Sequence, residues 1–112
     1  MDLDLLIDRV RYWAIKKGLD KADPYKQIVK LMEEAGELSG ALLRSNAEGI
    51  VDGIGDILVV LTILTQQLDL DLQTCLEHAY NEIKNRKGTL KNGVFIKENE
   101  NWKTITYNIF YI

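Results

Sequence analysis

Three carboxylates fall within five residues in the segment Glu33-Glu34-Ala35-Gly36-Glu37. At about 100° per residue, Glu34 and Glu37 lie about 60° apart on a helix, and Glu33 is expected to point nearly the opposite way. Two anionic groups beside a buried face are unfavourable unless a cation or a proton neutralises them. The segment therefore predicts a charged site at the edge of a helix's buried face. The apolar residues that define this face are Ile28, Leu31, Ala35, Leu38 and Leu42.

A second pair of carboxylates, Asp52 and Asp56, begins fifteen residues after Glu37. Their spacing places both on one face of a helix. Because this face also carries Val60 and Ile63, we expect the two aspartates to point into the interior. Ligand sets made of oxygen alone suit a hard cation such as Mg2+, with Mn2+ as an alternative. If the two helices face each other, the sequence predicts a metal site. Its predicted ligands are Glu34, Glu37, Asp52 and Asp56.

Length and composition exclude several classes of protein. A chain of 112 residues predicts one small domain, and 28% charged residues exclude a membrane class. The net charge of −3 provides no basic surface for nucleic acid. The acidic start Met1–Asp4 indicates no signal peptide, and the apolar run Ile57–Leu64 is far too short for a membrane span. We therefore expect a cytoplasmic enzyme or binding module with neither nucleic-acid nor membrane partners.

Helix-period patterns and end signals predict four helices. The first covers residues 2–17 and ends before Gly18, because glycine readily adopts the left-handed conformation of a helix end. The second starts at Asp23-Pro24, a cap followed by proline at the first helical position, and runs to about Arg44. The third spans roughly residues 47–68. The fourth runs from a cap at Asp71 to Gly88.

The third helix combines glycines with a segment that is apolar on every side, Ile57–Leu61. Such a helix is expected to be buried all round, which three short neighbours cannot achieve, so a homodimer or homotetramer is predicted. Glycine weakens a helix by about 1 kcal/mol relative to alanine. Either Gly53 and Gly55 permit tight helix packing, or they allow a phosphate to come close. The sequence leaves both interpretations open.

The end of the chain changes in character. Val94–Ile96 and Thr104–Tyr111 are rich in β-branched and aromatic residues, which predicts a C-terminal β hairpin. The predicted fold is thus all-α: a four-helix bundle over residues 1–88, followed by a short hairpin tail over residues 89–112.

Further candidates for binding lie outside the acidic segments. Trp13 could stack on a nucleobase, although an aromatic residue at helical spacing is more often part of a core. The cluster Asn81, Lys84, Arg86 and Lys87 could neutralise phosphates or merely complement the dipole of its helix. No nucleophile–base arrangement and no glycine-rich phosphate loop of the P-loop type occurs in the sequence. Metal-assisted hydrolysis is therefore the best enzymatic interpretation.

The order of these motifs resembles the MazG-like all-α nucleoside triphosphate pyrophosphatases. Glu33, Glu34 and Glu37 fit the family's E-E-x-x-E helix, and Asp52-Gly53-Ile54-Gly55-Asp56 follows at a family-like distance. The resemblance covers about residues 3–88. It implies a dimeric or tetrameric enzyme that uses Mg2+ to hydrolyse a (d)NTP to the monophosphate and pyrophosphate.

One position departs from the family pattern. The second motif of the family is E-x-x-D, and the position three residues before Asp56 is Gly53 instead of glutamate. Asp52, one residue earlier, is the candidate substitute. Two alternatives follow: a nucleotide-binding or oligomerisation module of the same fold that has lost turnover, or a hydrolase of a nucleotide alarmone.

The resemblance also implies roles for individual residues. Metal-bound water would attack the α-phosphorus, and Glu33 or a neighbouring carboxylate would accept its proton. The expected catalytic residues are Glu33, Glu34, Glu37 and Asp56. The expected substrate-binding residues are Trp13, Asn81, Lys84 and Arg86.

Overall fold

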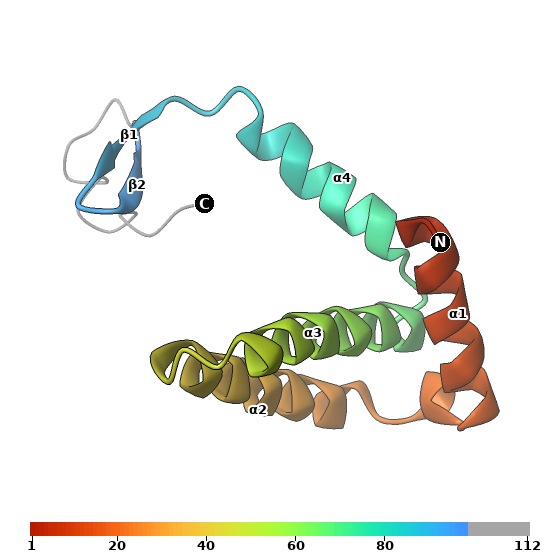
Figure 1. Cartoon of the computed structure of the whole chain (residues 1–112). Coiled ribbons are helices and arrows are strands. Elements are labelled where there is room, and N and C mark those ends of the chain that lie inside the picture. Colours follow the sequence, from red (N-terminus) through yellow and green to blue (C-terminus); the bar gives the residue numbers. More distant parts are fainter. Residues whose placement is uncertain (99–112) are drawn as a thin grey trace. The chain divides into compact units, whose positions relative to one another are not determined.

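The computed structural model describes residues 1–98 and consists of helices followed by one short hairpin (Figure 1). The helices are α1 (Leu3–Lys16), a 3-10 turn (Leu19–Lys21), α2 (Pro24–Leu43), α3 (Ala47–Gln67) and α4 (Leu72–Ile83); the strands are β1 (Gly88–Lys91) and β2 (Val94–Lys97). This confirms the predicted all-α fold class with a C-terminal hairpin. The chain divides into two compact units, Met1–Leu72 and Gln73–Ile112. The predicted domain boundary after residue 88 stays a prediction.

The helix ends of the first unit follow the capping signals of the sequence. Asp2 accepts a hydrogen bond from the Leu5 amide, and Asp23 accepts one from the Tyr25 amide, each at 2.9 Å. Gly18 follows α1 with a φ of 75°, which explains why glycine stands there. At the start of α3 the Asn46 side chain accepts a hydrogen bond from the Gly49 amide at 3.1 Å. These caps satisfy amide groups that have no partner within their own helix.

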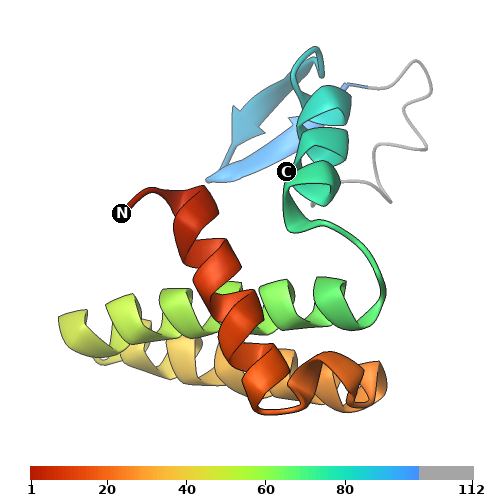
Figure 2. The same cartoon turned by 90° about the vertical axis from the view of Figure 1, so that its right-hand side faces the viewer.

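Helices α2 and α3 lie side by side and antiparallel, as both views show (Figures 1 and 2). The buried apolar side chains that hold the unit together are Ala14, Ala41, Val60 and Ile63. Helix α1 packs on α3, where the Gln66 amide group donates a hydrogen bond to the Arg11 carbonyl at 3.2 Å. The short connection from α2 to α3 thus brings the two predicted acidic helices face to face.

The close contact between α2 and α3 depends on Gly53, which is buried. A Cβ atom at this position would lie 3.0 Å from the Leu38 Cβ and 3.2 Å from the Leu38 Cα. At Gly55 an added Cβ would meet no atom within 4 Å outside its own helix. Of the two interpretations left open by the sequence, tight helix packing therefore describes Gly53.

The apolar surface of α3 is only partly covered within the chain. Val51 is 71% exposed, Ile54 51% and Leu58 47%. Within the described residues of the single chain, part of the circumference of α3 is left uncovered, as the sequence predicted for a lone chain. The homodimer or homotetramer that would cover the remainder stays a prediction.

The second unit contains a hairpin earlier in the chain than predicted. Helix α4 ends at Ile83, before the predicted end at Gly88, and β1 follows. The strands pair antiparallel, with Gly88 opposite Lys97 and Lys91 opposite Val94. Asn92 and Gly93 both have positive φ, at 52° and 77°, which matches the two-residue turn that this dipeptide favours. The predicted strand 94–96 thus lies in β2, whereas its predicted partner, residues 104–111, lies outside the described residues.

Hydropathy along the described helices does not support a membrane span. Within residues 1–98, no helix is both long and apolar enough to cross a bilayer.

The two glycines of α3 form a matched pair for testing the helix contact. Both Gly53→Ala and Gly55→Ala gain helix propensity, but only Gly53→Ala inserts a methyl group against Leu38. Because overpacking costs about 1–3 kcal/mol, we expect Gly53→Ala to be less stable than Gly55→Ala by roughly that amount. Chemical denaturation of both variants measures the difference. Equal free energies of unfolding would show that the contact at Gly53 is loose.

Candidate active site

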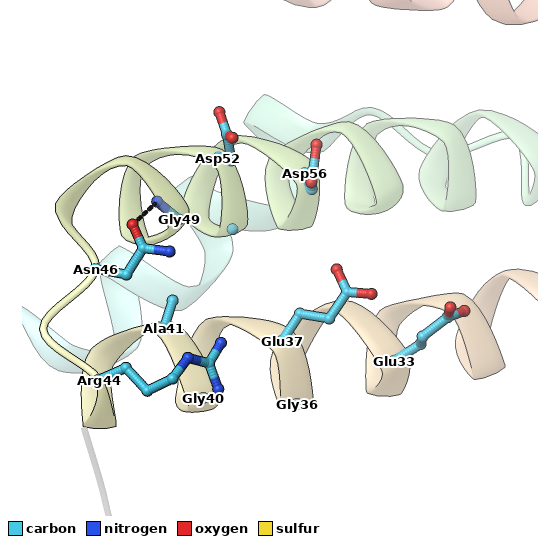
Figure 3. Close-up of a pocket in the computed structure, with 11 residues that line it drawn as sticks. Glu33, Gly36, Glu37, Gly40, Ala41, Arg44, Asn46, Gly49, Asp52 and Asp56 are labelled. Atoms are coloured by element: carbon cyan, nitrogen blue, oxygen red, sulfur yellow. Dashed lines mark hydrogen bonds between the residues drawn. The ribbon is translucent and has the colours of Figure 1, made fainter.

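A pocket of about 670 Å³ lies between α2 and α3 and collects most of the predicted acidic residues (Figure 3). Glu37 contributes from α2, and Asp52 and Asp56 contribute from α3. Figure 3 shows the Glu37 carboxylate directed toward α3. The other lining residues are Glu33, Gly36, Gly40, Ala41, Arg44, Asn46, Gly49 and Gly53. The helices predicted to carry the site therefore do place their carboxylates around one cavity.

Glu33 lines this pocket together with Glu37. The expectation that Glu33 points nearly the opposite way is therefore wrong. Residues four positions apart on a helix differ by only about 40° in direction, so Glu33 and Glu37 share a face. Glu33, the predicted general base, thus lies on the same side of α2 as Glu37, a predicted metal ligand.

Glu34 is only 6% exposed and does not line the pocket. Its Oε1 lies 3.2 Å from the Lys30 ammonium, which also lies 3.5 Å from Glu33. A hydrogen bond to Glu34 and the negative charges of both glutamates raise the pKa of Lys30. The second carboxylate oxygen of Glu34, Oε2, is buried and has no hydrogen-bond partner among the described residues. One lysine thus neutralises part of the acidic segment and leaves a buried oxygen unsatisfied.

The negative charge of Glu34 also acts on Glu37. It raises the pKa of the Glu37 carboxyl, and desolvation and the charge of Glu33 contribute in the same direction. The ionised form of Glu37 is therefore disfavoured by its neighbour, as expected for like charges held close together.

Asp52 and Asp56 are exposed, and the prediction that they point into the interior is wrong. The face of α3 that packs on α2 instead carries Gly53, and the aspartates lie at the border of this contact, facing the pocket. They are one helical turn apart on α3 (Figure 3). Water therefore reaches both carboxylates in the single chain.

The pocket fits a hard divalent cation in its chemistry. Its acidic groups offer only oxygen donors, whereas the unsatisfied oxygen of Glu34 lies outside the pocket lining. Among residues 1–98, no three acidic, histidine or cysteine side chains approach closely enough to hold an ion. Binding of Mg2+ by these carboxylates therefore stays a prediction.

The structure gives a physical reason for the departure at Gly53. A side chain at this position would press against the Leu38 backbone and side chain, so a glutamate here would require Leu38 to shift by a few tenths of an ångström. Asp52 lines the same pocket from the adjacent position. It is thus placed to supply a carboxylate that Gly53 lacks.

Sequence reasoning missed Arg44 and Asn46, which also line the pocket. Arg44 follows the last residue of α2, and Asn46 caps α3. The sequence signal that could have indicated Arg44 is the spacing of Gly36, Gly40 and Arg44 at intervals of four residues. This spacing places two glycines and one cation on the helix face that also carries Glu33 and Glu37.

The predicted substrate-binding residues belong to different units. Trp13, in the first unit, is 48% exposed and lines an apolar pocket with Leu6, Arg9, Val10 and Val59. In the second unit Asn81 lies on α4, and Lys84 and Arg86 follow its end. Arg86 lines a cavity of about 520 Å³ with Glu82, Asn85, Lys87, Lys97 and Glu98. Their roles in binding stay predictions.

Comparison with known proteins identifies the class. The sequence model of the MazG nucleotide pyrophosphohydrolase domain matches residues 24–91, which include the pocket, and the chain belongs to this family. Membership supports a hydrolase that acts on nucleotides, and hydrolases of this family generally use divalent metals.

A curated relative comes from a bacteriophage. Over 71 residues the chain is 41% identical to an uncharacterized 18.2 kDa protein of the rep-hol intergenic region of Haemophilus phage HP1. The match covers 62% of this chain and 44% of the phage protein, so the chain spans less than half of that relative's length. No solved structure matches the chain.

The repulsion between Glu34 and Glu37 leads to a stability prediction. We expect Glu37→Gln to raise the melting temperature in the presence of a chelator, because it removes a charge that Glu34 disfavours. Millimolar Mg2+ should raise the midpoint of the parent by binding the native state, and should raise that of the variant less. Thermal unfolding with chelator and with Mg2+ measures both effects. Asp8→Asn, which removes an exposed charge from α1, is the control and should change neither midpoint appreciably.

Proposed function

We propose that this chain is a Mg2+-dependent nucleoside triphosphate pyrophosphohydrolase that converts a (d)NTP to the monophosphate and pyrophosphate. The observation that carries the proposal is the convergence of carboxylates from α2 and α3 on one pocket, in a chain of the MazG family. Oxygen donors on two facing helices are suited to a hard cation, and such a cation binds polyphosphates. We also propose a cytoplasmic location and a homodimer or homotetramer, with Mn2+ as an alternative ion.

The carboxylates of Glu34, Glu37 and Asp56 would hold the ion, with Asp52 contributing directly or through water. A bound Mg2+ would supply Lewis-acid stabilisation of charge on the phosphates and a water molecule of lowered pKa. Glu34 lies outside the pocket lining, but its Oε2 is buried without a hydrogen-bond partner, and such an oxygen is costly unless a ligand satisfies it. Coordination of an ion would satisfy this atom.

Glu33 is suited to accept a proton from the attacking water. It lines the pocket beside Glu37 and is half exposed, so it can reach a water molecule in the cavity. In the reaction, the water oxygen forms a bond to the α-phosphorus and its proton passes to the carboxylate. The bond from the α-phosphorus to the bridging oxygen breaks, and the electron pair leaves with pyrophosphate. General-base assistance of this kind is worth about 10²–10⁴-fold in rate.

The nucleotide would receive further contacts from the remaining candidates. We assign Lys84 and Arg86 to phosphate binding, Asn81 to the nucleotide, and Trp13 to stacking on the base. The cations support this role because phosphate oxygens accept charge-assisted hydrogen bonds.

A non-catalytic nucleotide-binding or oligomerisation module is the second candidate. The glycine at position 53 favours it, since the site lacks the glutamate of the family pattern there. Metal-dependent release of pyrophosphate separates this candidate from the enzyme.

The bond that is cleaved provides the first test of the proposal. Hydrolysis in water labelled with heavy oxygen should place the label in the nucleoside monophosphate, because attack occurs at the α-phosphorus. Mass spectrometry of the products of a (d)NTP screen measures this. Label in orthophosphate would indicate a phosphatase, and an absence of Mg2+-dependent turnover across the screen would favour the non-catalytic module.

The role of Asp52 can be tested against that of Asp56. If both serve the ion, Asp52→Ala and Asp56→Ala should each raise the Mg2+ concentration for half-maximal activity by about tenfold or more, an effect typical of losing a ligand or its support. Glu48→Ala removes an acid from the first turn of α3, outside the pocket lining, and serves as the control. An unchanged Mg2+ titration in Asp52→Ala would exclude Asp52 from the site.

A further inference from the structure

Arg44 introduces a cation into a pocket whose other charged lining residues are carboxylates. It is the residue that caps the C-terminal end of α2, and its side chain is exposed. Figure 3 shows the guanidinium group lying over α2 on the side of Gly40, along the same helix as Glu37. The pocket therefore has an anionic part and a cationic part.

The position of the guanidinium group depends on the absence of a side chain at Gly40. A Cβ atom there would lie 3.0 Å from Nη1 and 3.4 Å from Nη2 of Arg44. Gly36 likewise leaves the α2 surface bare, since a Cβ atom there would meet nothing within 4 Å. A path of exposed backbone thus leads from the carboxylates to the guanidinium group.

The hydrogen-bonding capacity of Arg44 is not used by the protein's own acids. Within residues 1–98, no ion pair within 4.0 Å joins Arg44 to a carboxylate. This holds although four carboxylates line the same pocket. The guanidinium group is therefore available to an anion that enters the cavity.

A cation at the C-terminal end of a helix can also serve only to complement the helix dipole. In that role the charge would lie beyond the last turn, close to its free carbonyl groups. The Arg44 guanidinium group instead lies back over Gly40, one turn toward the start of α2 and inside the pocket lining. This placement of the guanidinium group suits the binding of a ligand in the pocket better than it suits the neutralisation of the helix dipole.

We propose that Arg44 binds the β- and γ-phosphates of the substrate, the part that leaves as pyrophosphate; this rests on the proposed function. A planar guanidinium group forms paired hydrogen bonds to phosphate oxygens. When the bond between the α-phosphorus and the bridging oxygen breaks, the electron pair remains on pyrophosphate, and Arg44 neutralises part of the added charge. The carboxylates would hold the cation near the α-phosphorus, while Arg44 holds the other end of the chain of phosphates.

The test compares Arg44→Gln with Lys26→Gln, which removes an equal charge from an exposed position on α2 outside the pocket. Losing a hydrogen bond to a charged group predicts that Arg44→Gln raises KM for the triphosphate and the inhibition constant of pyrophosphate about 10- to 100-fold. The inhibition constant of the nucleoside monophosphate should not change. Lys26→Gln should have the same constants as the parent. The pyrophosphate inhibition constant of Arg44→Lys should lie between those of the parent and Arg44→Gln. Melting temperatures verify that the variants fold.

Several outcomes would overturn the assignment of Arg44. They are an unchanged pyrophosphate constant in Arg44→Gln, an equal weakening of pyrophosphate and monophosphate, or an equal effect of Lys26→Gln. Titration calorimetry of pyrophosphate with Mg2+ provides the same comparison without turnover. A parent that binds pyrophosphate through Arg44 but hydrolyses no triphosphate would refute the enzyme and retain the anion site. If the parent hydrolyses triphosphate and Arg44→Gln has no effect on the constants, the enzyme is retained and the anion site at Arg44 is refuted.

Discussion

The close approach of α2 and α3 is the constraint on which the site depends. Gly53 lets the backbone of α3 lie against Leu38, and near the turn Gly49 does the same against Ala41, where an added Cβ would be 3.0 Å from the alanine methyl group. Were the helices held apart by side chains at these positions, the carboxylates of α2 and α3 would be separated as well. The pocket therefore depends on these glycines, which have no side chain, as much as on the residues that carry charge.

Charge along the acidic segment of α2 is unevenly balanced. Lys30 contacts Glu33 and Glu34 and offsets part of their repulsion, but the buried Oε2 of Glu34 remains without a partner in the described chain. The negative charge of Glu34 raises the pKa of Glu37. A protein that tolerates such strain commonly does so because a ligand relieves it, and functional sites are a frequent location of this kind of destabilisation. The arrangement is consistent with a native state that becomes more stable when a cation binds.

Much of the fold could be predicted from the sequence because its signals are local. Caps at Asp2 and Asp23 and the apolar periodicity of α2 depend on neighbouring residues alone. Errors arose where the outcome depends on packing between elements: the direction of Asp52 and Asp56 depends on which face of α3 meets α2. The strand β1 was missed because Gly88–Lys91 has little β-branched character, although Asn92-Gly93 carried the turn signal. Arg44 was missed because its significance comes from a pocket that only the folded helix pair creates.

The contact between Gly53 and Leu38 also restricts the paths by which this sequence can evolve. A single substitution that restores glutamate at position 53 would meet the Leu38 Cβ and Cα before its carboxylate could reach the pocket. A shift of Leu38, a smaller residue at position 38 or a wider separation of the helices would relieve this contact, so the two positions are expected to be coupled. Each change alone would be harmful, since one creates a clash and the other a cavity. The helix contact thus links the residue at position 53 to the residue at position 38 in any sequence that carries the family glutamate.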